Sequence, residues 1–321
     1  MAKRVLITGG AGFIGSHVAD LFITEGWEVE IIDNLVTGKQ RNIPAAATHH
    51  QIDIGSPDAA RLVRDGRFDA LVHLAAQMDV RKSVADPVFD AGTNIVGTLN
   101  LLEAVRAGGG RTRIVFSSTG GALYGDYTTP PNAESFPKDP ESPYAISKLS
   151  AEYYMAYYGR VHGMTSVVLR YGNVYGPRQD PHGEAGVVAI FSGRILDGTP
   201  LTVFGDGTQT RDYVFVGDVA RATFIAASAK LPAQKLLDSH AYNIGTGLGT
   251  SVMQVAETLK RAAKSDVDVI HAPKRPGEQQ HSFLVVEKAA KELGWAPKVS
   301  LTDGLRQTYD WFAAQRVGPT A

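Results

Sequence analysis

A tyrosine and a lysine stand four residues apart in the segment Tyr144-Ala145-Ile146-Ser147-Lys148. On a helix this spacing places the phenol and the ammonium on one face, one turn apart. A free phenol has a pKa near ~10 and is a poor base at neutral pH, but a neighbouring cation favours the phenolate. The pair therefore predicts a general base for an alcohol proton, although the same spacing is common on solvated helix faces.

Three hydroxyl-bearing residues, Ser117, Ser118 and Thr119, follow an apolar run that begins at Arg113. Such hydroxyls can share a hydrogen bond with a substrate oxygen and orient it toward Tyr144. The other interpretation is a strand-end turn rich in serine and threonine. Both interpretations place these side chains at the end of a strand.

A glycine pattern, G-x-x-G-x-x-G, occurs at Gly9, Gly12 and Gly15, between a predicted strand at 4–8 and a predicted helix at 16–24. The first glycine permits a tight turn, the second lets the backbone approach a pyrophosphate, and the third lets helix and strand pack closely. The helix N-terminus offers free N–H groups to the phosphates. This context predicts a dinucleotide site.

An acidic residue, Asp33, ends the next predicted strand, 18 residues after Gly15. A carboxylate at about this distance accepts hydrogen bonds from a ribose diol and repels a 2′-phosphate. Asp33 therefore favours NAD over NADP, while the nearby Lys39 and Arg41 keep NADP open. A turn cap is the alternative role for Asp33.

Strand-like and helix-like segments alternate along the first half of the chain. Short apolar runs predict strands at 4–8, 28–32, 70–74, 113–117 and 166–170. Helical spacing is found at 16–24, 58–64, 96–106 and 144–158, and in the second half at 218–229, 251–264 and 301–315. This order predicts an α/β fold, a parallel sheet covered by helices on both faces.

The composition excludes several classes of chemistry. The chain has 321 residues, enough for about two domains, and a net charge of −1, which argues against a general polyanion binder. It has no cysteine, which excludes disulfides, thiolate metal sites and a cysteine nucleophile. No run approaches the ~20 apolar residues of a membrane span. We therefore expect a cytoplasmic protein with no metal, nucleic-acid or membrane partner.

Taken together and in this order, these motifs resemble the extended short-chain dehydrogenase/reductase family. Within it, the chain is similar to the nucleotide-sugar enzymes of the UDP-galactose (UDP-glucose) 4-epimerase type, over about residues 3–312. The resemblance implies a Rossmann-type doubly wound sheet with a smaller, interleaved C-terminal substrate domain. Residues 1–172 and 213–245 would then bind NAD, and residues 173–212 and 246–321 the nucleotide sugar.

The resemblance also implies roles for individual residues. Tyr144 is then the base, Lys148 binds the nicotinamide ribose, and Thr119 is the catalytic hydroxyl with Ser118 as its close competitor. Further cofactor contacts are implied for Phe13, Ile14, Asn34, Asp53, Ile54, Leu74, Ala75, Ala76, Asn94, Ser117 and Tyr171. Contacts with the UDP-sugar are implied for Thr119, Tyr144, Asn173, Val187, Phe204, Arg211, Arg275, Glu278 and Ser282.

The residues after Thr119 bear on the reaction. Related dehydratases carry an acidic pair there, and the decarboxylases that make UDP-xylose a glutamate, but this chain has Gly120 and Gly121. The resemblance therefore implies NAD-dependent 4-epimerisation of a UDP-hexose through a transient 4-keto sugar. A UDP-glucuronate epimerase or decarboxylase is the alternative, and a non-catalytic NAD-binding protein is a third possibility.

Two further expectations come from the resemblance. Ser282 stands where some epimerases carry a bulky aromatic residue, so the pocket should also admit the N-acetyl sugars. The family often dimerises through two helices per subunit, so we expect a homodimer built on 96–106 and 145–158. An enzyme of this type would serve galactose metabolism.

Overall fold

Seven parallel strands form the central sheet of the computed structural model, which describes residues 2–181, 186–274 and 279–317. Their order across the sheet is β11-β6-β5-β4-β1-β2-β3. Their bounds are β1 Arg4–Thr8, β2 Glu28–Ile32, β3 Thr48–His50, β4 Ala70–His73, β5 Arg113–Thr119, β6 Ser166–Tyr171 and β11 Ala241–Ile244. The order reverses direction between β1 and β4, which creates a crevice at the carboxyl ends of these strands.

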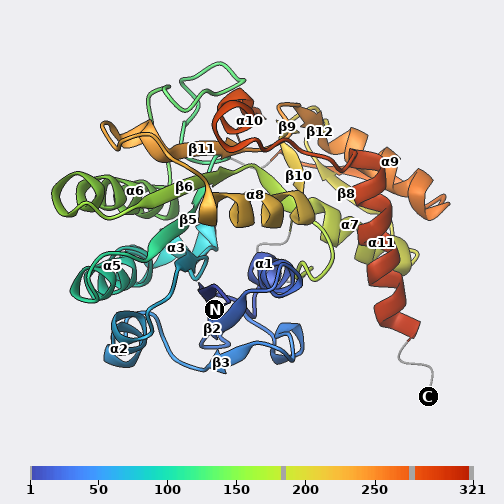
Figure 1. Cartoon of the computed structure of the whole chain (residues 1–321). Coiled ribbons are helices and arrows are strands. Elements are labelled where there is room, and N and C mark those ends of the chain that lie inside the picture. The colour runs from blue at the N-terminus through green and yellow to red at the C-terminus, as the bar shows by residue number, and fades with distance from the viewer. Residues whose placement is uncertain (1, 182–185, 275–278, 318–321) are drawn as a thin grey trace.

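Helices cover both faces of this sheet (Figure 1). One face carries α1 (Phe13–Thr24) and α8 (Val216–Ser228), and the other carries α2 (Pro57–Asp65), α5 (Gly97–Ala107) and α6 (Pro143–His162). The central strands β1 and β4 carry buried apolar residues on both faces, as is typical of buried parallel strands. In β1, for example, Val5 and Ile7 pack toward α1 and α8, whereas Leu6 packs toward α2 and α5.

Local sequence explains where the long helix α6 begins and ends. Ser142 caps its N-terminus by accepting a hydrogen bond from Ala145 N, and Pro143 occupies the first turn, where its missing N–H costs nothing. Gly163 ends the helix in the left-handed conformation, with φ +66°. Tyr144 is therefore fixed in the first turn of a 20-residue helix.

A smaller unit lies beside the sheet, on the side away from α5 and α6 in Figure 1. Its helices are α7 (Val187–Leu196), α9 (Val252–Ala263) and α11 (Leu301–Val317). Its strand pairs are β8 (Leu201–Phe204) with β13 (Val269–Ala272), and β9 (Thr210–Arg211) with both β12 (Thr250–Ser251) and β14 (His281–Ser282). They enclose a second core that includes Phe191, Leu201, Leu259 and Leu305.

Short elements join the two units. β7 (Asn173–Tyr175) pairs in parallel with β10 (Tyr213–Phe215), so the chain leaves the large sheet after β6 and returns through α8. The remaining elements are η1 Gln40–Asn42, α3 Val80–Ala85, α4 Pro87–Ala91, the π-helical turn η2 Gly92–Val96, η3 Leu237–His240 and α10 Glu287–Leu293. The two units thus alternate along the chain.

The doubly wound, Rossmann-type α/β fold expected from the sequence is confirmed. Helix α1 begins three residues earlier than expected, at Phe13, because Gly12 is its N-cap. Strand β5 extends two residues beyond Ser117, so that Thr119 still pairs with Tyr171 on β6. Within the described ranges, no helix is both long and apolar enough to cross a membrane.

Candidate active site

The sequence-predicted residues follow the carboxyl ends of neighbouring strands. Gly9 follows β1, Asp33 follows β2, Leu74 follows β4, Thr119 ends β5 and Tyr171 ends β6. Because all of these strands are parallel, their carboxyl ends lie along one edge of the sheet. Ligands of open α/β sheets bind at this edge, outside the strand ends where the strand order reverses.

The glycine turn is built so that only glycine fits at two of its positions. Gly9 has φ +73°, and a Cβ there would lie 2.8 Å from Ala75 N. A Cβ on Gly15 would lie 2.1 Å from the carbonyl oxygen of Gly9, so α1 can pack this closely against the turn only without a side chain. Gly12 is the N-cap of α1 and has no side-chain cap, so the first N–H groups of the helix keep no side-chain partner there. This is a cradle suited to a pyrophosphate.

Residues after β4 border the same turn. Leu74 N and Ala75 N each donate a hydrogen bond of 3.2 Å to Thr8 Oγ1, and Ala76 follows them half-buried. Phe13 and Ile14, in the first turn of α1, pack partly against the core of the smaller unit. The predicted cofactor segments from β1, α1 and β4 are therefore contiguous.

Asp33 is buried next to the glycine turn. Its carboxylate accepts hydrogen bonds from Ala11 N (2.9 Å) and Leu35 N (2.8 Å). These bonds include the turn-capping role considered from the sequence, but a carboxylate has room for about four hydrogen bonds. Nearby, Asn34 Nδ2 donates to Asp53 Oδ2 at 2.9 Å, and Ile54 is buried below them.

Lys148 is buried between α6 and the end of β5. Its Nζ donates a hydrogen bond of 3.0 Å to Ser117 O, and it lies 5.9 Å from the ring centre of Tyr144. Burial lowers the pKa of Lys148 to about 8, while the negative charges of Asp90 and Glu152 raise it. The ammonium, the phenol ring and the end of β5 are thus brought together, with Thr119 as the next residue but one after Ser117.

The three hydroxyls of β5 face different neighbours. Ser117 Oγ donates to His73 O, and Ser118 Oγ donates to the buried Glu152 carboxylate at 2.5 Å. Thr119 is half-buried at the open end of the strand. Of the two candidates for the catalytic hydroxyl, Ser118 is therefore engaged with α6.

Asn94 connects three parts of the site. Its Nδ2 donates to Gln77 O, Asp90 Oδ1 and Ser147 Oγ, and its Oδ1 accepts from Gln77 N. Ser147 lies on α6 between Tyr144 and Lys148, so Asn94 fixes the π-helical turn η2 against the helix that carries both.

Two of the residues expected to bind the sugar nucleotide, Arg211 and Ser282, lie side by side on β9 and β14. Ser282 pairs with Arg211 in the β9–β14 ladder, and Ser282 Oγ lies 3.4 Å from Gly121 O, two residues after Thr119. Asn173 is exposed at the start of β7, Phe204 ends β8, and Val187 begins α7. Arg275 and Glu278 lie outside the described residues.

Tyr171 lies in the core of the large sheet, unlike the exposed Asn173. Its side chain is buried in the core under α8, and its hydroxyl shares a hydrogen bond of 2.9 Å with Thr223 Oγ1. Burial raises the pKa of its phenol. Its hydroxyl is thus engaged within the protein.

Comparison with known proteins decides the family. A family model described as GDP-mannose 4,6 dehydratase matches residues 6–308. The chain belongs to this family. It is a family of extended short-chain dehydrogenases/reductases, as expected from the motifs.

Several members of this family have solved structures. A UDP-glucose 4-epimerase of Thermotoga maritima, solved with UDP-glucose, is 44% identical, with a TM-score of 0.92 over 98% of this chain and 99% of that one. A UDP-glucose 4-epimerase of Thermus thermophilus, solved with NAD, is 45% identical, with a TM-score of 0.87 over 97% and 99%. A UDP-N-acetylglucosamine 4-epimerase of Methanobrevibacter ruminantium M1, solved with UDP-N-acetylmuramic acid, is 33% identical, with a TM-score of 0.90 over 98% and 99%.

Asp212 is a buried acid that was not among the residues predicted for the site. Asp212 accepts hydrogen bonds from Thr246 N (2.6 Å), Thr246 Oγ1 (2.7 Å), Gly247 N (3.1 Å) and Leu284 N (3.3 Å). Its carbonyl oxygen accepts from Asn173 N at 2.6 Å. Asp212 therefore ties the β9–β10 segment to β7, β14 and the loop after β11. Its position next to Arg211 was the only signal in the sequence.

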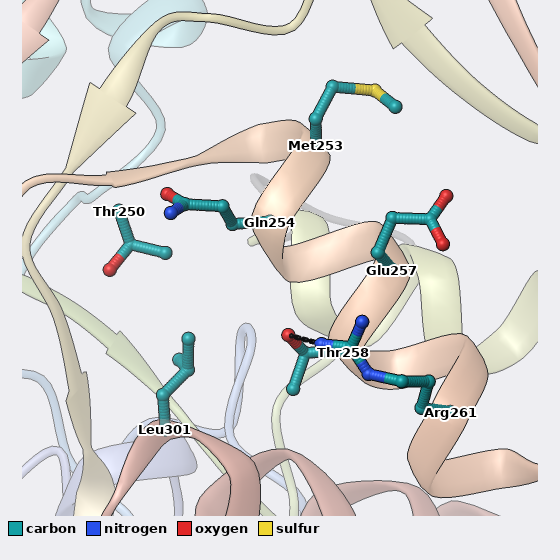
Figure 2. Close-up of a pocket in the computed structure, with 7 residues that line it drawn as sticks. All are labelled: Thr250, Met253, Gln254, Glu257, Thr258, Arg261 and Leu301. Atoms are coloured by element: carbon teal, nitrogen blue, oxygen red, sulfur yellow. Dashed lines mark hydrogen bonds between the residues drawn. The ribbon is translucent and has the colours of Figure 1, made fainter.

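A hollow on the smaller unit is separate from these residues. Figure 2 shows Met253, Gln254, Glu257 and Arg261 projecting from α9, with Leu301 at the start of α11 below Gln254. No sequence-predicted site residue lines it. Its exposed, mixed lining offers none of the chemistry found at the ends of β1, β4 and β5.

Proposed function

We propose that this chain is an NAD-dependent 4-epimerase of UDP-hexoses, acting on UDP-glucose and UDP-galactose. One observation carries the proposal: the buried Lys148 holds the Tyr144 helix against the end of β5, where Thr119 is followed by two glycines. This arrangement supplies one acid–base group and one orienting hydroxyl, with no acid after Thr119 to drive elimination or decarboxylation. Relatives that act on UDP-glucose support the substrate class.

The dinucleotide cradle fits NAD. Glycine at positions 9 and 15 lets the turn, α1 and the segment after β4 pack closely together. Gly12 leaves the N-terminus of α1 without a side-chain cap, and the Asp33 carboxylate retains acceptor capacity for a ribose diol. Phe13, Ile14, Asn34, Asp53, Ile54, Leu74, Ala75, Ala76, Asn94, Ser117 and Tyr171 are the further cofactor-side residues that we propose. When bound, NAD supplies reversible acceptance of a hydride from the sugar C4.

The chain's own residues handle the proton and the position of the sugar. Tyr144, as phenolate, takes the proton of the C4 hydroxyl as the alcohol becomes a ketone, and returns it when the alcohol re-forms. Lys148, positively charged beside the ring, favours the phenolate. Thr119 shares a hydrogen bond with the reacting oxygen. Inversion requires the 4-keto sugar to turn over between the two half-reactions.

The sugar must therefore turn while the nucleotide stays in place. We propose that Arg211 holds the diphosphate together with Arg275, with Glu278 on the uridine ribose and Asn173, Val187 and Phe204 lining the remainder. A guanidinium suits this task because it binds two phosphate oxygens at once. Residues 173–212 and 246–321 then form the substrate domain, and residues 1–172 and 213–245 the NAD domain.

We propose that the N-acetyl sugars are also substrates. Ser282 is 2% exposed and lies against Gly121, two residues from Thr119, so a small side chain there enlarges the pocket near the sugar. The related epimerase of Methanobrevibacter ruminantium, solved with a UDP-N-acetyl sugar, supports this proposal.

We also propose a homodimer. Ile146, Tyr153, Tyr157 and Val161 form one apolar face of α6, here called the α6 stripe, and are 50%, 56%, 43% and 58% exposed. Val88, Phe89 and Val96 extend this apolar surface over the adjoining α4 and η2 and are 81%, 43% and 60% exposed. A continuous patch of this kind is typical of a protein interface. The cytoplasmic location and a role in galactose metabolism remain predictions.

The purified chain, incubated separately with UDP-glucose, UDP-N-acetylglucosamine and UDP-glucuronate, tests the proposal. We expect NMR to show the C4 epimers of UDP-glucose and UDP-N-acetylglucosamine as products. Loss of CO2 from UDP-glucuronate would indicate the decarboxylase alternative instead. Conversion of none of the three, with NAD bound, would indicate a non-catalytic NAD-binding protein.

A further inference from the structure

A buried ion pair lies directly behind the candidate active site. Arg170 on β6 and Glu152 on α6 both have side chains that are 0% exposed, and Arg170 Nη2 lies 2.6 Å from Glu152 Oε2. Arg170 Nε also donates to both Glu152 oxygens, at 3.1 and 3.2 Å, and its Nη1 donates to Tyr124 Oη and Glu134 O. Its Nη2 forms a second ion pair with the half-buried Asp238, also at 2.6 Å. Buried ion pairs are costly to desolvate and contribute little to stability. We therefore consider the role of this pair in positioning its neighbours.

The ion pair contacts strand β5 through a hydrogen bond from Ser118 to Glu152. Ser118 and Arg170 are partners in the β5–β6 register, so both side chains lie on the face that α6 covers. Glu152 lies one helical turn after Lys148 and accepts the Ser118 hydroxyl hydrogen bond at 2.5 Å. The preceding strand residue, Ser117, accepts the Lys148 hydrogen bond through its carbonyl oxygen. The two residues before Thr119 are therefore pinned to α6 at successive turns.

We infer that Glu152, held by Arg170, is a positioning residue for the reaction. Through Ser118 it sets Thr119 relative to Tyr144, and its negative charge supports the ammonium of Lys148. This inference rests on the proposed function only for its kinetic readout. Glu152 contacts neither substrate nor cofactor in this role, and Ser118 acts as its link rather than as the catalytic hydroxyl.

The charges around Lys148 give the inference a pH signature. Asp90 on α4 and Glu152 on α6 are the acids that raise the pKa of Lys148 against its burial. His73 on β4 also faces it, but burial and the Lys148 charge lower its pKa to about 3, so it is neutral. Tyr144, on α6 itself, is a further titratable neighbour of Lys148, and Arg170 on β6 is the cation paired with Glu152. Removing the Glu152 charge should lower the pKa of Lys148 further, so that Lys148 loses its proton at a lower pH.

Four variants test the inference on the full chain: Glu152→Gln, Ser118→Ala, Ser118→Ala with Glu152→Gln, and Ser166→Ala. Ser166 is the matched control, a buried serine that also bonds α6, through Met155 O, but at the opposite end of the sheet. For Glu152→Gln we expect a loss of kcat similar to that of Ser118→Ala, and an alkaline limb of kcat that moves down by about one pH unit. For Ser118→Ala we expect kcat to fall roughly tenfold, with the KM for UDP-glucose and the alkaline limb unchanged.

Coupling and titration complete the test. The double variant should lose less than the product of the two single losses, because both act through one contact. NMR titration of [13C]lysine-labelled protein, with Lys148→Met to assign the signal, should show the lowered Lys148 pKa in Glu152→Gln without any turnover. If the wild type epimerises nothing, the proposed function fails while this titration still decides the role of the Glu152 charge.

Three results would overturn the inference. One is a Glu152→Gln variant whose folded fraction has wild-type kcat and an unmoved Lys148 titration. Another is a Ser118→Ala variant as active as Ser166→Ala. The third is a kcat that falls more than 100-fold in Ser118→Ala, together with a loss in the double variant equal to the product of the two single losses. That result would make Ser118 itself the catalytic hydroxyl. Since Ser118→Ala removes only one hydroxyl, it keeps the inference testable even if Glu152→Gln does not fold.

Discussion

At the scale of single residues, the chemistry depends on keeping one phenol basic. Tyr144 stands in the first turn of α6, and the Lys148 ammonium, which is itself buried, lies 5.9 Å from the centre of its ring. Lower local dielectric strengthens the interaction. The proposed base therefore depends as much on the burial of Lys148 as on the tyrosine.

A variant without the Tyr144 hydroxyl tests whether this phenol is the base. Tyr144→Phe removes the proton acceptor and keeps the ring, so we expect kcat to fall by about 10²- to 10⁴-fold, the range of general acid–base contributions. Conversion of UDP-glucose followed by NMR measures it, and titration with NAD should show unchanged binding. Turnover within a few-fold of wild type would remove Tyr144 from the mechanism.

We expect the preference between UDP-glucose and UDP-N-acetylglucosamine to depend on the side chain of Ser282. Ser282→Tyr adds an aromatic ring beside Gly121, so conversion of UDP-N-acetylglucosamine should fall at least tenfold relative to UDP-glucose, equivalent to about 1.4 kcal/mol. Paired kcat/KM values for the two sugars give the ratio. Ser282→Ala is the matched control and should keep the wild-type ratio. An unchanged ratio in Ser282→Tyr would place the N-acetyl group elsewhere.

At the scale of elements, local patterns were enough to predict the strands, the turn and the helix that carry the proposed NAD side. The glycine turn, the strand that precedes it and the i, i+4 pair on α6 each depend on residues close in sequence, so their geometry could be predicted. The smaller unit depends on strands of two to four residues that pair across long separations, such as β9 with β14. Asp212 could not be recognised because its hydrogen-bond partners lie 34, 35 and 72 residues away.

A substitution of Asp212 therefore tests how the short strands of the smaller unit are held together. Asp212→Ala leaves the N–H groups of Thr246, Gly247 and Leu284 without their acceptor, and each unsatisfied buried group costs about 1–3 kcal/mol. We expect a loss of several kcal/mol in urea unfolding. In the folded fraction, the KM for UDP-glucose should rise more than the Kd for NAD.

An exposed aspartate provides the comparison for this variant. Asp206 also accepts backbone and side-chain hydrogen bonds, from Thr208, but in a solvated turn. Asp206→Ala should change stability by less than about 0.5–1 kcal/mol. Equal effects of the two variants on stability and on both affinities would show that Asp212 does not organise the sugar side.

At the scale of the whole molecule, the two units share the chain rather than dividing it. The chain leaves the sheet after β6, forms β7 to β10, and returns as α8 against α1 before β11 completes the sheet. Neither unit can therefore be cut out as one continuous piece. The α6 stripe points away from the sheet and is exposed, so it is the surface on which the proposed dimer would form.

Charge placed on the α6 stripe should separate the proposed subunits. Tyr153→Glu with Tyr157→Glu puts two carboxylates on an apolar surface, and burying unpaired charge at an interface is strongly unfavourable. We expect sedimentation velocity to show a dimer for the wild type and a folded monomer for the variant. Ile270→Glu, at a 47% exposed apolar residue on β13, is the matched control and should remain dimeric.

Because the α6 stripe lies on the helix that carries Tyr144 and Lys148, the monomeric variant should also have a lower kcat. A variant that still sediments as a dimer would exclude α6 from the interface.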